Sequence, residues 1–116
     1  MVVEDDQGVL NLVVSVLRAN AYTALEAGCA WDALTLCKDH AEPIDLLLTD
    51  LRLPDLHGLE LAQRIVALRP GIRCLFMSGY AVDPASVPED RFLEKPFELE
   101  VLMHAVESAL TASCGS

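Results

Sequence analysis

Residues 44–50 read Ile-Asp-Leu-Leu-Leu-Thr-Asp, an apolar run that ends at a carboxylate. A short apolar run bounded by polar and turn residues predicts a buried strand. Three other runs end in the same way: Val2-Val3 at Glu4-Asp5-Asp6, residues 72–77 at Ser78-Gly79, and residues 92–94 at Lys95-Pro96. If these strands are parallel, their polar ends meet at one edge of the sheet, where open α/β sheets bind ligands.

Helical patterns separate the predicted strands. Apolar residues recur at helical spacing in four segments, which predicts helices over residues 7–19, 30–38, 58–68 and 98–112. A fifth short strand is predicted over residues 21–26. In the helix over residues 30–38 we place Trp31, Leu34 and Cys37 on or near one face. Strands alternating with helices of this length predict βαβ units and a parallel sheet.

Residues 81–90, Ala-Val-Asp-Pro-Ala-Ser-Val-Pro-Glu-Asp, break the alternation. A proline inside a helix removes a hydrogen bond and clashes with the preceding turn. Because Pro84 and Pro88 both lie in this segment, we expect a single turn or an irregular loop there instead of a full fourth helix.

Composition favours one compact domain over residues 1–112, with a frayed tail at residues 113–116. Of the 116 residues, 53% are hydrophobic, which argues against disorder. The net charge of −10 argues against direct binding to nucleic acid or to an anionic membrane. No apolar run approaches the ~20 residues that span a bilayer, and no leader pattern precedes the first strand, so we expect a cytoplasmic chain. The cysteines form no metal-binding or redox motif and are predicted to be free thiols: Cys29, Cys37, Cys74 and Cys114.

The polar ends of the strands suggest phosphoryl chemistry. Glu4, Asp5 and Asp50 form an oxygen-rich set of the kind that Mg²⁺ prefers. An aspartate can act as a nucleophile and form an aspartyl phosphate, and Asp50 is the best candidate because it ends the most apolar strand. Lys95 would supply a positive charge, and Ser78 with nearby amides would supply hydrogen bonds, to the phosphoryl oxygens.

Each of these residues also has a purely structural interpretation. Asp5 or Asp6 can cap the first helix, and Asp50 can be a turn residue after a strand. Lys95 can be an ordinary solvated lysine, and Ser78-Gly79 can be only a turn. The functional interpretation depends on all four signals occupying the same structural position in the right order.

Four stretches together resemble the receiver domain of two-component response regulators: VVEDD (2–6), LLLTDLRLPDLHG (46–58), FMSGY (76–80) and FLEKPF (92–97). The resemblance extends from Val2 to about Leu110. PIDLLLTD (43–50) and LRPGIRCLFMSGY (68–80) are similar to receivers attached to hybrid histidine kinases. The resemblance implies a flavodoxin-like, doubly wound five-stranded parallel sheet with strand order 2-1-3-4-5.

The resemblance also implies a role for each site residue. Asp50 would be the phosphoacceptor, assisted by Ser78 and Lys95. Mg²⁺ would be held by Glu4, Asp5, Asp50 and the backbone carbonyl of Arg52. The Lys95-Pro96 bond would be cis, and the switch residues would be Ser78, Tyr80 and Phe92.

The implied partner is a histidine kinase or histidine phosphotransfer domain, with no nucleic acid, membrane or small-molecule substrate beyond phosphodonors. The domain would not be an enzyme, although it would catalyse its own phosphorylation and dephosphorylation. A degenerate receiver that only binds proteins, or a small aspartate-nucleophile phosphohydrolase, are the alternatives. The stretch between Ser78 and Lys95 is shorter than is usual in the family, which calls the usual dimerisation and output face into question. The chain would be a single-domain regulator or a segment of a larger protein such as a hybrid kinase.

Overall fold

The computed structural model describes residues 1–79 and 91–111. Five strands within them form one sheet in the order β2-β1-β3-β4-β5. All neighbouring strands pair in parallel. The strands are β1 (Val2–Val3), β2 (Glu26–Ala27), β3 (Leu46–Asp50), β4 (Arg73–Ser78) and β5 (Phe92–Glu94). The flavodoxin-like sheet and its strand order are therefore confirmed.

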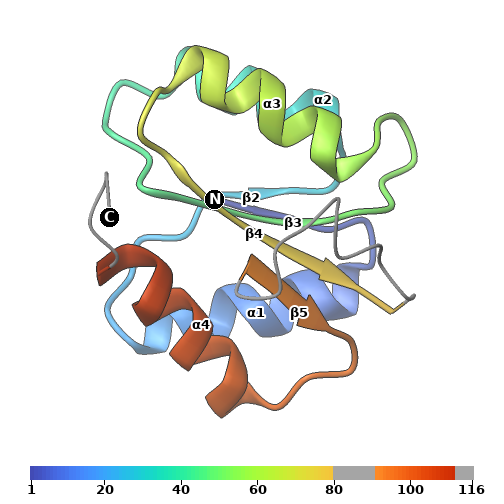
Figure 1. Ribbon diagram of the computed structural model, residues 1–116, viewed down its shortest axis with the longest axis vertical. Helices are drawn as coiled ribbons and strands as arrows, with labels where there is room; N and C mark the ends of the chain where they lie inside the picture. Colours follow the sequence, from blue (N-terminus) through green and yellow to red (C-terminus); the bar gives the residue numbers. More distant parts are fainter. Residues whose placement is uncertain (80–90, 112–116) are drawn as a thin grey trace.

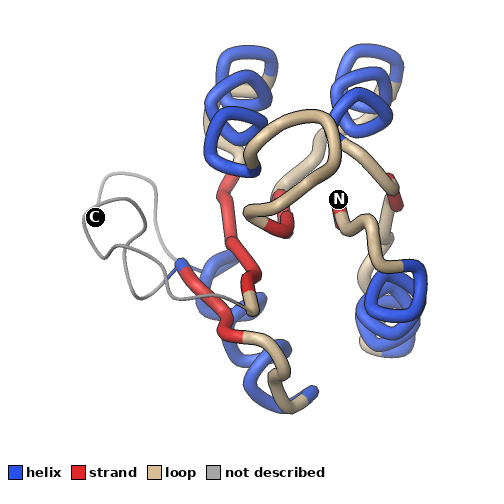
Figure 2. Tube along the Cα trace, turned by 90° about the vertical axis from the view of Figure 1, so that its right-hand side faces the viewer, coloured by secondary structure: helices blue, strands red, loops and turns tan. Residues whose placement is uncertain are grey.

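In the part of the chain that the structure describes, two helices cover each face of the sheet. Helices α2 and α3 lie on one face, and α1 and α4 lie on the other (Figures 1 and 2). Their bounds are α1 (Gln7–Ala19), α2 (Ala30–Asp39), α3 (Gly58–Leu68) and α4 (Leu99–Thr111). The predicted bounds hold for α1 and α3, and those for α2 and α4 agree within one residue at each end.

The strand predicted over residues 21–26 is wrong in its bounds, since β2 contains only Glu26 and Ala27. The chain first turns back on the end of α1: the amides of Ala21 and Tyr22 donate to the carbonyls of Arg18 and Leu17. Ala21 has a φ of 68°, in the left-handed region that ends a helix. Pairing starts only at Glu26, which is the first residue to lie beside Val2 of β1.

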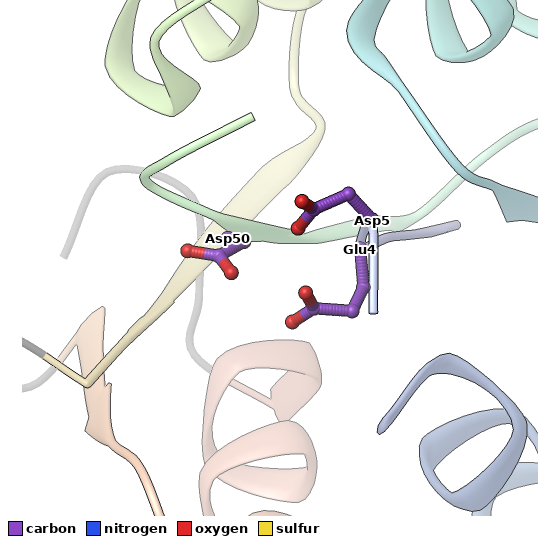
Figure 3. Close-up of side chains that lie close together, drawn as sticks. All are labelled: Glu4, Asp5 and Asp50. Carbon is purple, nitrogen blue, oxygen red and sulfur yellow. The ribbon is translucent and has the colours of Figure 1, made fainter. Parts of the chain in front are cut away.

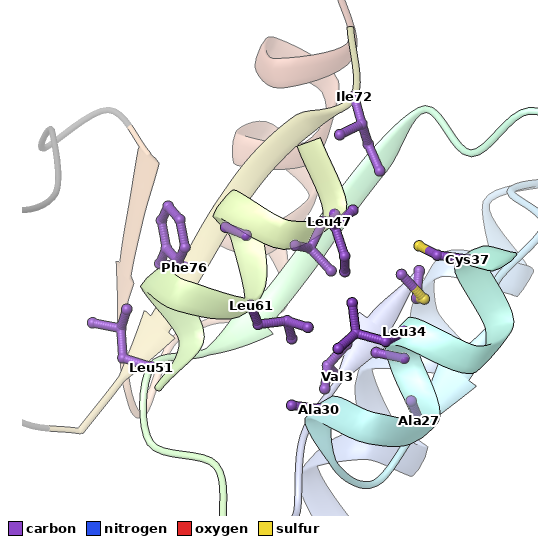
Figure 4. Close-up of a cluster of buried hydrophobic side chains, with 14 residues drawn as sticks. Val3, Ala27, Ala30, Leu34, Cys37, Leu47, Leu51, Leu61, Ile72 and Phe76 are labelled. Carbon is purple, nitrogen blue, oxygen red and sulfur yellow. The ribbon is translucent and has the colours of Figure 1, made fainter. Parts of the chain in front are cut away.

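The core has two halves, one on each face of the sheet. Side chains alternate across a strand, so Leu47 joins the half under α2 and α3, while Leu46 and Leu48 join the half under α1 and α4. Figure 4 shows the first half, where Leu61 of α3 and Leu34 of α2 lie in one cluster with Leu47. Because every residue of β3 is buried, its last residue, Asp50, is held in a fixed position.

Trp31 does not belong to the buried face of α2, contrary to the sequence prediction. The buried stripe contains Ala30, Ala33, Leu34 and Cys37, at the spacing of one helix face. Trp31 is one residue, or about 100°, away from Ala30 and keeps 54% of its surface exposed. The guanidinium carbon of Arg64 on α3 lies 5.6 Å from the centre of its ring, a cation–π contact.

Several predictions fall outside the described residues: the loop over 81–90, the Tyr80 switch position, the tail over 113–116 and Cys114. Among the described cysteines, Cys29, Cys37 and Cys74 are free thiols. No helix in the described part of the chain has the length and apolar character needed to cross a bilayer.

Candidate phosphoacceptor and metal site

Three carboxylates meet at the carboxyl edge of the sheet. Val3 of β1 lies beside Thr49 of β3, so the residues that follow, Glu4 and Asp50, are also neighbours. Glu4, Asp5 and Asp50 each offer a carboxylate oxygen, and these oxygens all lie within 4.8 Å of one another. Figure 3 shows the three side chains converging on one region. The predicted cluster of acids is therefore present.

The neighbouring acids have different environments. Glu4 and Asp50 are 1% and 7% exposed, whereas Asp5 is open to solvent. Asp6 caps α1, because its Oδ1 accepts from the amides of Gly8 (2.9 Å) and Val9 (3.2 Å). The helix cap that the sequence allowed for Asp5 or Asp6 is therefore Asp6. Glu4 and Asp5 are the acids that lie near Asp50.

Lys95 provides the positive charge of the site. Its Nζ donates to Asp50 Oδ2 at 2.7 Å and also to the carboxylate of Glu4. The position follows from the sheet: Ser78 lies beside Glu94, and the amide of Lys95 donates to the Ser78 carbonyl at 2.8 Å. The Lys95-Pro96 peptide bond is cis, as the resemblance implied. One lysine therefore serves two buried carboxylates.

The ionisation of these groups reflects the charge balance. Burial is the main reason that the pKa of Glu4 is raised to about 7, and the charge of Asp50 adds to this. The hydrogen bonds from Lys95 and the Asp6 amide reduce the shift without cancelling it. Burial by itself lowers the pKa of Lys95, but its hydrogen bonds to Asp50 and Glu4 outweigh burial, and the pKa is raised. A second cation would be stabilised here, because three acids face one lysine.

The loop after β3 is tightly built around Asp50. Asp50 Oδ1 accepts from the amide of Arg52 at 3.0 Å, so its two oxygens point to different partners. The amide of Gly58 donates to the Leu51 carbonyl, and a Cβ at Gly58 would lie only 2.3 Å from the Asp50 carbonyl oxygen. Glycine is needed there because the start of α3 touches the backbone of the strand end. His57 caps α3, because its Nδ1 accepts from the Leu59 amide at 3.2 Å.

Two more predicted site residues, Ser78 and Phe92, lie on β4 and β5. Ser78 ends β4, one residue beyond the pair formed by Met77 and Asp50, and it is 2% exposed. Phe92 is half-buried at the start of β5 beside Phe76. The contacts at the carboxyl edge of the sheet thus join Glu4, Asp50 and Lys95, with Asp5 beside them.

Residues 1–107 match the family model described as the response regulator receiver domain. The chain belongs to the receiver domain family. It is 33% identical to the response regulator receiver protein CpdR of Brucella abortus, with 97% of each chain covered. It is 31% identical to the sensor kinase CckA of the same organism, covering 95% of this chain but only 12% of the kinase's length.

Solved structures agree with this assignment. The receiver domain of the hybrid histidine kinase CckA matches with a TM-score of 0.82 and 30% identity, covering 95% of this chain and 96% of that one. A CheY-like receiver domain protein from Methanospirillum hungatei matches with a TM-score of 0.83 and 27% identity, covering 94% and 90%. The family functions in two-component signalling, and its members share the fold described above.

Sequence reasoning missed one residue of this receiver domain. Asp55, in the loop after Asp50, accepts through its two carboxylate oxygens from the amides of Ala30 and Trp31, each at 3.0 Å. Cys29, the N-cap residue of α2, makes no side-chain capping bond. Burial by itself raises the pKa of Asp55, but the two amides outweigh it and the pKa is lowered. The available signal was the weak cap at Cys29, since helix N-termini need acceptors for their amides.

Proposed function

We propose that this receiver domain accepts a phosphoryl group on Asp50 from the phosphohistidine of a histidine kinase or phosphotransfer domain, with Mg²⁺. The observation that supports this most is the setting of Asp50 at the sheet edge. Its carboxylate lies 2.7 Å from the Lys95 ammonium and within 4.8 Å of carboxylate oxygens of Glu4 and Asp5. Positioning and neutralisation of negative charge are most of what phosphoryl transfer requires.

The donor set suits Mg²⁺, which binds hard oxygen ligands and retains several waters. Asp5, Asp50 and the Arg52 carbonyl would hold the ion, and Glu4 would act directly or through a water. Bound Mg²⁺ would neutralise the charge of the incoming phosphoryl oxygens. The excess of carboxylates over lysine in this buried edge favours such a cation.

The transfer replaces one bond to phosphorus with another. A carboxylate oxygen of Asp50 forms a bond to phosphorus as the phosphorus–nitrogen bond to the donor imidazole breaks, and the imidazole keeps the electron pair. The Lys95 ammonium then pairs with a phosphoryl oxygen instead of Asp50 Oδ2. The Ser78 hydroxyl donates a hydrogen bond to a second phosphoryl oxygen. Ser78 and Phe92, with Tyr80, would pass this change to the neighbouring surface. Water later attacks the phosphorus, the bond between phosphorus and the Asp50 oxygen breaks, and inorganic phosphate leaves, which restores the free Asp50 carboxylate.

The alternatives have less support. A receiver that only binds proteins has no need for the full set of acids, hydroxyl and lysine, all of which are present here. A phosphohydrolase would need a substrate-sized pocket beside Asp50. A cavity of about 320 Å³ in the described part of the chain lies at the opposite edge of the sheet instead, where Tyr22, His40 and Leu46 are among its lining residues.

The test is to incubate the protein with Mg²⁺ and acetyl phosphate or phosphoramidate and to measure its intact mass. We expect a labile adduct of about 80 Da, one phosphoryl group, on the wild-type protein. Asp50→Asn should abolish it. Asp45→Asn is the matched control, because Asp45 is an exposed acid that precedes the same strand. Labelling of the Asp50→Asn protein at the wild-type rate would disprove the assignment of Asp50.

A further inference from the structure

Both ends of α2 are bound by residues that flank α3. At its N-terminus the Asp55 carboxylate accepts from the amides of Ala30 and Trp31. At its C-terminus the Arg69 guanidinium donates to the carbonyls of Cys37, His40 and Glu42. An anion thus meets the positive end of the helix dipole, and a cation meets the negative end. These contacts join residues far apart in the sequence and fasten α2 to the segment over residues 55–69.

The contacts of Asp55 and Arg69 join α2 to different parts of the fold. Arg69 follows α3, at the amino edge of the sheet and away from the acids. Asp55 lies in the loop that begins at Asp50, three residues after Arg52. That loop is fixed at its base by the Arg52 amide on Asp50 Oδ1 and by the Gly58 amide on the Leu51 carbonyl. Asp55 fixes its outer part to a different element of the fold.

We propose that Asp55 is a positioning residue for the metal site. By docking the loop over residues 51–57 on the N-terminus of α2, it holds the Arg52 backbone beside Asp50, where the carbonyl can reach a cation. This inference rests on the proposed function, because the Arg52 carbonyl matters only if Mg²⁺ binds.

The carboxylate is suited to this task. It has two oxygens for two amides, whereas an asparagine has one acceptor oxygen. Its negative charge also strengthens the hydrogen bonds at the helix N-terminus. Residues that hold metal ligands in place without touching the metal commonly change affinity by a factor of 10 or more when removed.

The test compares Asp55→Ala and Asp55→Asn with Arg69→Ala as the matched control. Arg69→Ala loosens the other end of α2 without touching the loop. The Mg²⁺ dissociation constant is measured from amide chemical shifts of residues 50–58, and the labelling rate is measured by intact mass at several Mg²⁺ concentrations. We expect Asp55→Ala to raise the dissociation constant on the order of tenfold, with a smaller rise for Asp55→Asn. At saturating Mg²⁺ the labelling rate should return to that of the wild-type protein.

Arg69→Ala should lower the melting temperature but leave the Mg²⁺ dissociation constant unchanged. Equal changes in that constant for Asp55→Ala and Arg69→Ala would show a general loss of stability and overturn the inference, as would an unchanged constant in Asp55→Ala. If the wild-type protein neither binds Mg²⁺ nor becomes labelled, the proposed function fails. Hydrogen exchange of the backbone amides then tests separately whether Asp55 docks the loop on α2. Faster exchange at Ala30, Trp31 and residues 51–57 in Asp55→Ala, but not in Arg69→Ala, supports the docking, and unchanged exchange refutes it.

Discussion

Replacing Lys95 with methionine tests the charge balance of the site, because it removes the ammonium group but keeps the apolar stem. Lys95 Nζ lies 2.7 Å from Asp50 Oδ2 and also binds Glu4. At an effective dielectric constant of about 20, a contact of this length corresponds to an attraction of about 6 kcal/mol. The two carboxylates left behind, with oxygens up to 4.8 Å apart, repel each other by about 3.5 kcal/mol on the same scale.

Much of the attraction is offset, since burying these groups removes their hydration. The net loss should therefore match that of breaking a buried ion pair, about 3 kcal/mol. The assay is urea unfolding in EDTA at about pH 9, because the pKa of Glu4 is about 7 beside Lys95 and the loss of Lys95 raises it further. Lys38→Met is the control, since Lys38 is the other lysine of the chain and is exposed on α2.

A second substitution separates charge from packing. In the Lys95→Met background, Glu4→Gln removes one of the two repelling charges and should recover part of the lost stability. A Lys95→Met protein within about 0.5 kcal/mol of wild type in EDTA would refute the reasoning. So would a double variant that is no more stable than Lys95→Met, because the loss would then come from packing and not from the unbalanced acids.

Three further predictions follow from the site. Mg²⁺ at about ten times its dissociation constant should stabilise the wild-type protein by about 1.4 kcal/mol, which is measured as a rise in melting temperature. EDTA should reverse this rise and also stop labelling, and a melting temperature that does not respond to Mg²⁺ would count against metal binding. Gly58→Ala should lower the free energy of unfolding by about 2–3 kcal/mol and slow labelling, because the new Cβ would lie 2.3 Å from the Asp50 carbonyl oxygen. Gly28→Ala is the control, since a Cβ there has no atom within 4 Å, and equal unfolding midpoints for the two variants would contradict the prediction. In the folded protein the pKa of Asp55 is lowered below its ordinary value of 3.8, so the stabilisation by its charge is present above that value and is lost as the pH falls below it. The stability difference between wild type and Asp55→Asn should therefore stay level down to about pH 5 and shrink below about pH 4, and a difference that does not change there would rule out a role for the charge.

Local patterns in the sequence determined much of this protein. Helices α1 and α3 have the predicted bounds, because each combines an apolar stripe at helical spacing with a clear start and stop. The carboxylates of Glu4, Asp5 and Asp50 were predicted to meet because each follows or ends a strand, and parallel strands align their carboxyl ends. These features depend only on periodicity, turn residues and the order of elements along the chain.

Tertiary structure decided what depends on a distant partner. Strand β2 begins at Glu26 because that residue is the first to lie beside a residue of β1, while Ala21 and Tyr22 bond to the end of α1. Trp31 is exposed because α2 buries the face that contains Ala30 and Leu34, and the Trp31 ring outside that face contacts Arg64 of α3. The bonds of Lys95 to both Glu4 and Asp50, and of Asp55 to the amides of α2, join segments that no local pattern relates. Such contacts are set by the packing of whole elements, which is why the sequence predicted the members of the site but not how they are held.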